Sequence, residues 1–225
     1  MSKEAVAKEL AKRVKDGDVI GLGSGSTVEL ALKHIGIRVK EEKLNIVGVP
    51  TSIRTARQAT NAGVSVISNF SDLEISWAFD GADEVDPELN LIKGRGAAML
   101  PEKIIAKRTK HFVVIVTEEK LVKNLGEKFA VPIEIIPEAL SLVKSELKAF
   151  NPDSITLRTS DAKYGPTITE NGNLILDVKF SSIPNTYEKD LKAITGVVET
   201  GLFIGLKPEV IVAKAGGIEI LRSAE

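Results

Sequence analysis

Three short segments of the sequence combine glycine with side chains that can bind or transfer charge. The first is residues 23–27 (GSGST), in which two glycines and three hydroxyl side chains separate a short apolar run from a helical stretch. Backbone N–H groups and the positive end of a helix dipole favour a phosphate at such a position. The same residues also fit a strand-to-helix turn that Ser26 or Thr27 caps. A Walker loop requires a lysine before the hydroxyl residue, and this segment has none. A dinucleotide fingerprint requires a third glycine, and Val28 takes its place.

The second segment, residues 80–86 (DGADEVD), holds four carboxylates within seven positions. It follows a predicted strand over residues 75–79 and therefore lies at the carboxyl end of that strand, where ligands bind in open α/β sheets. An acidic run of this kind suits a hard metal ion, although it lacks the ligand spacing of an EF-hand loop. A solvated acidic loop with capping aspartates is the alternative interpretation.

The third segment, residues 91–103, contains two glycines that let the backbone approach a ligand closely. Lys93 adds a compact cation, and Pro101 suits the first turn of a helix that Glu102 would begin. A carboxylate and an ammonium group would then face the same loop region. In the alternative interpretation, Lys93 and Arg95 are surface charges and Glu102 only offsets the helix dipole.

Apolar periodicity predicts the elements that position these segments. An amphipathic helix over residues 6–14 precedes a short buried strand over residues 19–22, and strands then alternate with helices. This alternation favours a mostly parallel sheet that is covered on both faces. The other elements expected in this part are strands over residues 44–49, 64–67, 75–79 and 112–116, and helices over residues 28–35, after Thr51-Ser52, and over residues 101–108.

From residue 131 the predicted order changes to strand, helix, strand, strand, helix, strand, which is the ferredoxin-like pattern. These elements are expected over residues 131–136, 138–150, 154–158, 173–180, 186–194 and 197–203. The last apolar run, residues 210–213, could return to the first sheet. We therefore expect an α/β protein with a Rossmann-like, mostly parallel sheet domain (residues 1–129 and 204–225) and a smaller ferredoxin-like α+β domain (residues 130–203).

Together these motifs resemble A-type ribose-5-phosphate isomerase over nearly the whole chain. The matching motifs are G-x-G-S-T after the first strand, residues 80–84 (DGADE), the K-G-x-G-A-A segment that begins at Lys93 with Glu102 downstream, and residues 196–203 (GVVETGLF). Ser24 stands where the family commonly has threonine, and Arg95 interrupts a run that is usually all glycine. The resemblance implies a Rossmann-like domain that carries the active site, followed by a ferredoxin-like domain.

The resemblance also implies a role for individual residues in an aldose-ketose isomerase of the pentose phosphate pathway. Glu102 matches the general base that moves a proton between C2 and C1 through a cis-enediol or enediolate, and Lys93 can stabilise the oxyanion. Asp80 and Asp83 match residues that bind sugar hydroxyls and assist ring opening. The other expected substrate contacts are Ser24, Gly25, Ser26, Thr27, Gly81, Ala82, Gly94, Arg95, Gly96, Lys120 and Lys3.

Composition limits the other classes of function. The 30 Lys+Arg residues nearly cancel the 31 Asp+Glu residues, so no global basic field attracts nucleic acid or anionic lipid. The absence of cysteine excludes disulfides, thiolate metal sites and a cysteine nucleophile. With no signal-peptide core and no run that could span a bilayer, we expect a cytoplasmic protein. The resemblance implies a sugar phosphate as the partner, no cofactor or metal, and a homodimer or homotetramer.

Two alternative functions remain at this point. An amino-sugar-phosphate deaminase would share the Rossmann-like architecture, but it is expected to have a catalytic histidine, and neither His34 nor His111 lies in a motif. A non-catalytic sugar-phosphate-binding regulator would need a DNA-binding module. Only one helix is expected before Val19, whereas a helix-turn-helix needs two.

Overall fold

The computed structural model describes residues 3–160 and 163–223, which form two compact units. The first unit comprises the described parts of residues 1–82, 101–120 and 206–225, and the second comprises residues 83–100 and 121–205. The chain therefore passes from the first unit to the second after Ala82 and returns after Leu100. It passes again after Lys120 and returns after Gly205.

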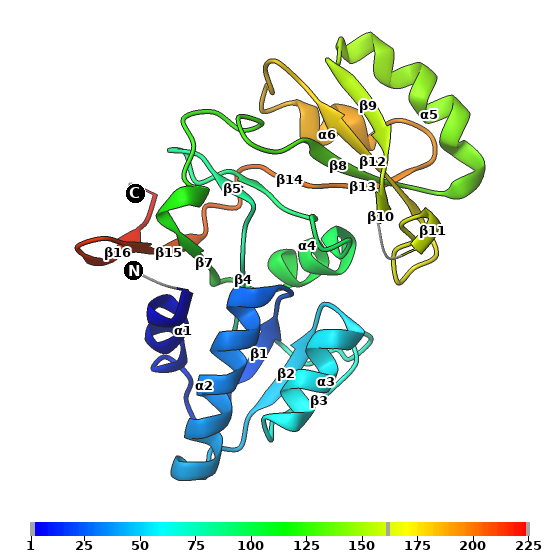
Figure 1. Cartoon of the computed structure of the whole chain (residues 1–225). Coiled ribbons are helices and arrows are strands. Elements are labelled where there is room, and N and C mark those ends of the chain that lie inside the picture. Colours follow the sequence, from blue (N-terminus) through cyan, green and yellow to red (C-terminus); the bar gives the residue numbers. More distant parts are fainter. Residues whose placement is uncertain (1–2, 161–162, 224–225) are drawn as a thin grey trace. The chain divides into compact units, whose positions relative to one another are not determined.

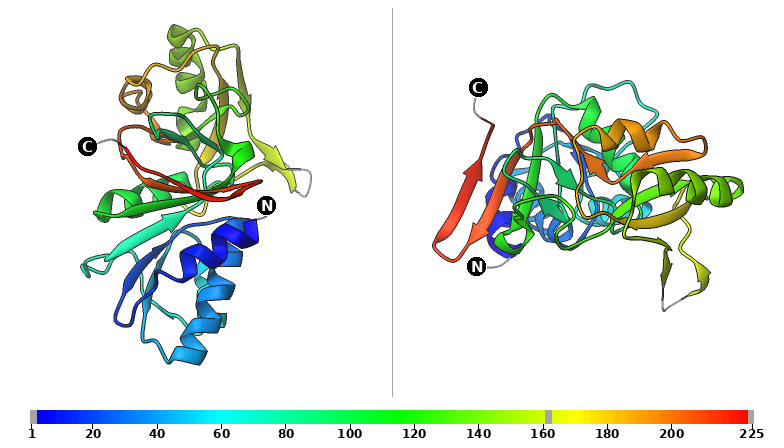
Figure 2. Two further views of the ribbon diagram at one scale, coloured as in Figure 1. Left: turned by 90° about the vertical axis from the view of Figure 1, so that its left-hand side faces the viewer. Right: turned by 90° about the horizontal axis from the view of Figure 1, so that it is seen from above.

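A seven-stranded sheet forms the centre of the first unit (Figure 1). The strand order is β16-β15-β7-β4-β1-β2-β3, and every neighbouring pair is parallel except β15 with β16. Figures 1 and 2 show β15 and β16 side by side as a hairpin. The strands are β1 (Val19–Leu22), β2 (Val47–Pro50), β3 (Ser65–Val66), β4 (Trp77–Asp80), β7 (Phe112–Thr117), β15 (Glu209–Lys214) and β16 (Gly217–Leu221).

Helices cover both faces of this sheet, as the predicted alternation requires. Ile20 and Leu22 belong to a buried cluster with residues of α1 and α2, whereas Gly21 points to the opposite face. There a β-carbon on Gly21 would lie 2.4 Å from Cγ2 of Ile105, so α4 packs closely on β1. The helices are α1 (Lys3–Ala11), α2 (Ser26–Glu42), α3 (Ile53–Asn61) and α4 (Met99–Arg108), and none of those in the described residues is long and apolar enough to cross a membrane.

The second unit contains a four-stranded sheet of order β13-β8-β12-β9, in which all neighbouring strands are antiparallel. Together with α5 and α6 this is the ferredoxin-like arrangement. Its elements are β8 (Val131–Ile135), α5 (Leu140–Glu146), β9 (Ser154–Leu157), β12 (Leu174–Lys179), α6 (Tyr187–Lys192) and β13 (Val197–Thr200). The shorter elements are β5 (Glu84–Val85), β6 (Leu91–Ile92), β10 (Thr159–Ser160), β11 (Lys163–Pro166) and β14 (Leu202–Phe203), with 3-10 turns η2 (Pro137–Ala139) and η3 (Leu147–Phe150).

The predicted fold class is confirmed, and the strand expected at residues 210–213 does return to the first sheet, beside β7. Several bounds differ. The helix expected at residues 28–35 continues to Glu42, and the one expected at 138–150 is α-helical only between two 3-10 turns. The strand expected at 197–203 is divided at Gly201, where a β-carbon would lie 2.3 Å from the Lys93 carbonyl oxygen.

The division into units also differs from the expected boundary at residue 129. Residues 83–100 and 121–129 group with the second unit. The reason is strand pairing: β6 lies between β5 and β14 in a three-stranded sheet, and Val85 forms a bridge with Leu121. Strand pairing therefore draws the glycine loop and the part of the acidic run from Asp83 onward into the second unit, while Asp80, Gly81 and Ala82 stay in the first.

Candidate active site

The carboxyl ends of β1 and β4 meet in the first unit. The chain runs outward from β1 through β2 and β3 and then returns on the other side of β1 as β4, so strand order reverses between these two strands. In open α/β sheets such a switch point is where ligands bind. Here the Asp80 carboxylate accepts hydrogen bonds at Oδ1 from the Ser24 N–H (3.0 Å) and the Gly81 N–H (2.7 Å). The structure thus brings the first and second candidate segments together.

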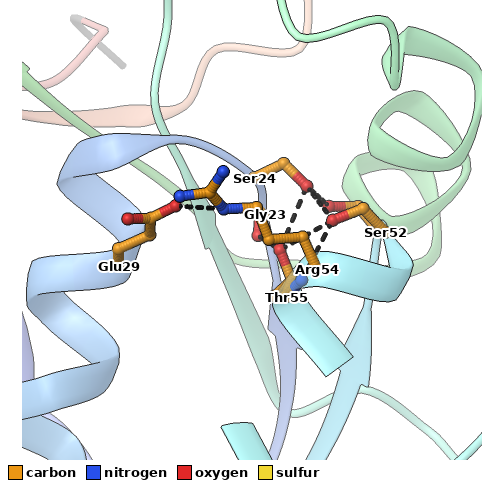
Figure 3. Close-up of polar contacts among 7 residues, drawn as sticks. Gly23, Ser24, Glu29, Ser52, Arg54 and Thr55 are labelled. Carbon is orange, nitrogen blue, oxygen red and sulfur yellow. Dashed lines mark hydrogen bonds and ion pairs between the residues drawn. The ribbon is translucent and has the colours of Figure 1, made fainter. Parts of the chain in front are cut away.

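Four hydroxyl side chains surround the start of the first loop (Figure 3). Ser24 Oγ is hydrogen-bonded to Thr51 Oγ1 (2.8 Å), Ser52 Oγ (2.8 Å) and Thr55 Oγ1 (3.1 Å). Thr55 also donates to the Gly23 carbonyl (2.9 Å), and Ser52 caps α3 by accepting from the Thr55 N–H. The sequence analysis used Thr51 and Ser52 only to mark the start of a helix and did not single out Thr55. The available signal was a hydroxyl cluster directly after a strand parallel to β1.

The first turn of α2 contains the remaining residues of the first segment. The helix begins at Ser26, and its N-cap is Gly25 with φ 121° and no side-chain cap. The interpretation in which Ser26 or Thr27 caps this helix is therefore wrong. Lys3 Nζ donates to Ser26 Oγ (2.8 Å), which brings one of the two expected lysines to the loop. A cation and a helix N-terminus are the features that stabilise a bound anion.

Glu102 and Lys120 also belong to the first unit. Because α4 leads into β7, its N-terminal turn lies at the same carboxyl edge of the sheet as the loop after β1. The helix starts at Met99, so Glu102 is the fourth residue of the helix and not the first. Glu102 is buried, with 4% of the residue exposed. Glu102 precedes Ile105 by one turn, and Ile105 packs against Gly21. Lys120 ends the 3-10 turn η1 (Glu118–Lys120) that follows β7 and is half-buried.

Asp83 and the glycine loop come together in the second unit. The Asp83 N–H donates to the Ile92 carbonyl (2.8 Å), and the Asp83 Oδ2 atom accepts from the Arg95 N–H (3.1 Å). The Lys93 N–H donates to the Gly201 carbonyl (2.8 Å). Lys93 is 3% exposed, and its Nζ lies 5.7 Å from the centre of the Phe203 ring. The buried side chain of Lys93 and the carboxylate of Asp83 thus belong to the same small loop region.

Arg95 fits into the glycine loop without strain. Its backbone is not in the left-handed region, which in this loop is adopted by Gly94 (φ 97°) and Ala97 (φ 62°). The exposed Arg95 guanidinium lies over the Phe129 ring, 4.9 Å from its centre. Gly94 is required by its conformation and by space, since a β-carbon there would lie 2.9 Å from Cβ of Met99. Gly96 is exposed.

The carboxylates of the acidic run point to different partners. Glu84 is fully buried and accepts from the N–H groups of Gly126 (2.6 Å), Lys128 (2.6 Å) and Phe129 (2.7 Å). Asp86 accepts from the Asn90 N–H (2.8 Å) and side-chain amide (3.0 Å). Within residues 3–160 and 163–223, no group of three or more His, Cys, Asp or Glu side chains is arranged to hold a metal ion.

The candidate residues therefore form two groups, one in each unit. Asp80, Gly81 and half-buried Ala82 stand with Glu102 in the first unit, and the GSGST loop, Lys3 and Lys120 belong there too. The second group consists of Asp83 with the loop that carries Lys93, Gly94, Arg95 and Gly96.

Comparison with known proteins gives one consistent family. The family model for ribose 5-phosphate isomerase A (phosphoriboisomerase A) matches residues 47–217. The ribose-5-phosphate isomerase A of Methanothermobacter thermautotrophicus is 44% identical over 98% of this chain and 97% of its own. A solved structure of ribose 5-phosphate isomerase A from Methanocaldococcus jannaschii has a TM-score of 0.94 at 41% identity and covers 98% of each chain. A solved D-ribose-5-phosphate isomerase in complex with phospho-erythronic acid has a TM-score of 0.95 at 44% identity, with 98% of this chain and 97% of that chain covered.

Proposed function

Because the chain belongs to the ribose 5-phosphate isomerase A family, we propose that it interconverts ribose 5-phosphate and ribulose 5-phosphate. The observation that carries this proposal is the match over 98% of the chain to a ribose-5-phosphate isomerase A at 44% identity. A second observation supports the substrate class, since a solved relative of 44% identity binds phospho-erythronic acid, a phosphorylated sugar acid.

In the proposed reaction Glu102 is the general base. Its carboxylate takes the proton from C2 of the open-chain aldose, and the electron pair moves toward the carbonyl oxygen to give a cis-enediolate. Glu102 then returns the proton to C1, and proton exchange between the two oxygens completes the ketose. Burial of Glu102 supports this role, because a carboxylate removed from water is a stronger base toward a bound substrate.

Lys93 stabilises the negative charge that develops on the substrate oxygen. Its side chain is buried, and an electrostatic interaction is stronger where water is excluded. Asp80 and Asp83 bind sugar hydroxyls and assist opening of the furanose ring, with Gly81 and Ala82 between them. In support of this role, backbone N–H groups orient both carboxylates.

The substrate phosphate binds at the Gly25–Thr27 turn, with Lys3 and Lys120 as its cationic partners. The start of α2 at Ser26 and the hydrogen bond from Lys3 to Ser26 support this position. Ser24 holds the turn through its hydroxyl network, and Gly94, Arg95 and Gly96 let the backbone approach the sugar. We further propose that the protein acts in the cytoplasm. We also propose that it is a homodimer or homotetramer, and light scattering on the purified protein tests this oligomeric state.

A coupled assay with ribose 5-phosphate tests the proposed activity directly. We expect ribulose 5-phosphate to form without added metal or cofactor, and activity to survive dialysis against a chelator. Release of ammonia from an amino-sugar phosphate, with no conversion of ribose 5-phosphate, would instead indicate a deaminase. Binding of ribose 5-phosphate without turnover would indicate a regulator.

A further inference from the structure

Arg158 contacts the backbone of the loop that carries Lys93. Its Nη1 atom donates to the Gly94 carbonyl (2.8 Å) and to the Arg95 carbonyl (3.2 Å), the two residues that directly follow Lys93. All of these residues belong to the second unit, yet Arg158 is more than 60 positions away in the sequence. None of the motifs that led to the candidate site includes Arg158.

Asp177 holds the guanidinium of Arg158 in place. Arg158 Nε donates to Asp177 Oδ2 (2.8 Å), and Nη2 donates to Oδ1, so the pair is bidentate. Both residues are anchored in the four-stranded sheet, since Asp177 lies in β12 and the Arg158 N–H donates to the Ile175 carbonyl (2.9 Å) of the same strand. The side chains are only 14% and 28% exposed, which limits screening by water.

We propose that Arg158 is a positioning residue for the isomerase reaction: clamped by Asp177, it fixes the loop that places Lys93 at the developing oxyanion. The inference rests on the proposed function of Lys93. The Arg95 N–H of this loop donates to Asp83, and the Arg95 carbonyl accepts from Arg158. One guanidinium thus constrains the backbone beside the cation and beside one of the two aspartates.

The chemistry of the clamp requires arginine. The planar guanidinium uses one edge for the carboxylate and its remaining N–H groups for the two carbonyls, whereas a lysine ammonium cannot hold both in a fixed geometry. A loosened loop would let Lys93 move, and a displacement of about 1 Å of a catalytic group can cost roughly a hundredfold in rate.

The test compares Arg158→Lys with the wild-type enzyme at a temperature well below both melting transitions. We expect kcat to fall by roughly tenfold to a hundredfold. Competitive inhibition by inorganic phosphate should not change, because the expected phosphate loop lies in the first unit. Asp177→Asn should also lower kcat, although it does not alter a side chain that contacts the loop. This variant serves as the test if Arg158→Lys does not fold.

The first unit offers a matched control. Arg38 is bidentate to Glu42, and its Nη1 donates to the carbonyls of Ala11 (2.7 Å) and Val14 (2.9 Å), so it repeats the geometry of Arg158 away from the candidate residues. Arg38→Lys should lower the melting temperature but leave kcat and KM unchanged. A similar loss of kcat in both variants would mean that Arg158 contributes only to general stability, and it would overturn the inference.

A double variant separates action through Lys93 from any other effect. In a Lys93→Met background, Arg158→Lys should change the residual kcat by less than about twofold, since the positioned group is gone. Additive losses, or wild-type kcat in a folded Arg158→Lys, would overturn the inference while the isomerase function stands. An inactive wild-type enzyme would instead refute the proposed function.

Discussion

Gly23 lies so close to Asp80 that a β-carbon on residue 23 would stand 2.1 Å from the carboxyl carbon of that aspartate. The contact joins the carboxyl ends of β1 and β4, where the Asp80 carboxylate accepts from the Ser24 N–H. Glycine is therefore required at this position by the space beside it, whatever its backbone conformation. A residue with any side chain must displace either the loop or the carboxylate.

Gly23→Ala should move Asp80 and lower kcat/KM by roughly tenfold to a hundredfold, because Asp80 is proposed to orient the sugar hydroxyls. Steady-state kinetics with ribose 5-phosphate measure the effect. Gly216→Ala is the matched control, since a β-carbon there would meet nothing within 4 Å and its φ is not positive. Equal kinetics for the two variants would show that the contact with Asp80 does not matter for turnover.

Glu102→Gln should keep the fold and lower kcat by roughly two to four orders of magnitude, the usual contribution of a general base. Glutamine has nearly the same shape and fits the same buried position, but it cannot accept the C2 proton. Incorporation of solvent deuterium into the substrate should fall in parallel. If the variant retained most of the wild-type turnover, the base would have to be Asp80 or Asp83.

The strand and helix pattern of the first unit could be read from the sequence because apolar periodicity is a local property. It placed the GSGST loop and the acidic run each after a buried strand. The pairing of Ser24 with Asp80 depends instead on β4 returning beside β1, and the sequence between these two residues, which are 56 positions apart, carries no local mark of that strand order. Only the resemblance to a family linked the two segments in advance.

Non-local hydrogen bonding explains what sequence reasoning missed. Glu84 stands in the acidic run, but its carboxylate satisfies N–H groups more than 40 residues away. Arg158 and Asp177 meet across neighbouring strands of the second unit, and neither residue has a motif around it. The length of α2 was underestimated for a similar reason, since Arg38 donates to the carbonyls of Ala11, the last residue of α1, and of Val14 beyond it, and so supports turns beyond residue 35.

Thr27→Ala should raise KM for ribose 5-phosphate by about tenfold, the loss expected for a hydrogen bond to a charged group. Thr27 does not cap α2, so the free energy of unfolding should change by less than about 0.5 kcal/mol. Some loss of kcat is compatible with binding energy that is used in the transition state. Kinetics and thermal melting on the same variant provide both values.

Thr60→Ala removes the same hydroxyl from the exposed surface of α3 and serves as the control for Thr27→Ala. Its KM should equal that of the wild-type enzyme. The phosphate assignment would be abandoned if Thr27→Ala melted at a lower temperature and kept the wild-type KM.

Glu209 connects β15 to the segment that follows α1 and to the segment that follows β16 in the first unit. Its carboxylate, with 8% of the residue exposed, forms ion pairs with Arg13 and with Arg222 Nη2 (2.7 Å). Burial alone would raise the pKa of Glu209, but hydrogen bonds from Arg222 and Arg13 outweigh burial and hold the pKa below its usual 4.5. The ionised carboxylate therefore stabilises the folded protein, with no role in the proposed chemistry.

A folded-state pKa below the unfolded value means that this stabilisation is complete above the unfolded pKa and disappears as the pH falls through the folded one. Glu209→Gln should therefore lower the free energy of unfolding by about 2 kcal/mol at pH 7, and the difference from the wild-type protein should shrink below about pH 4. Denaturant unfolding across this pH range measures the difference. Glu9→Gln, which breaks an exposed ion pair with Lys12, should cost less than about 1 kcal/mol. A difference for Glu209→Gln that stayed constant from pH 7 to pH 3 would mean that its ionisation does not stabilise the fold.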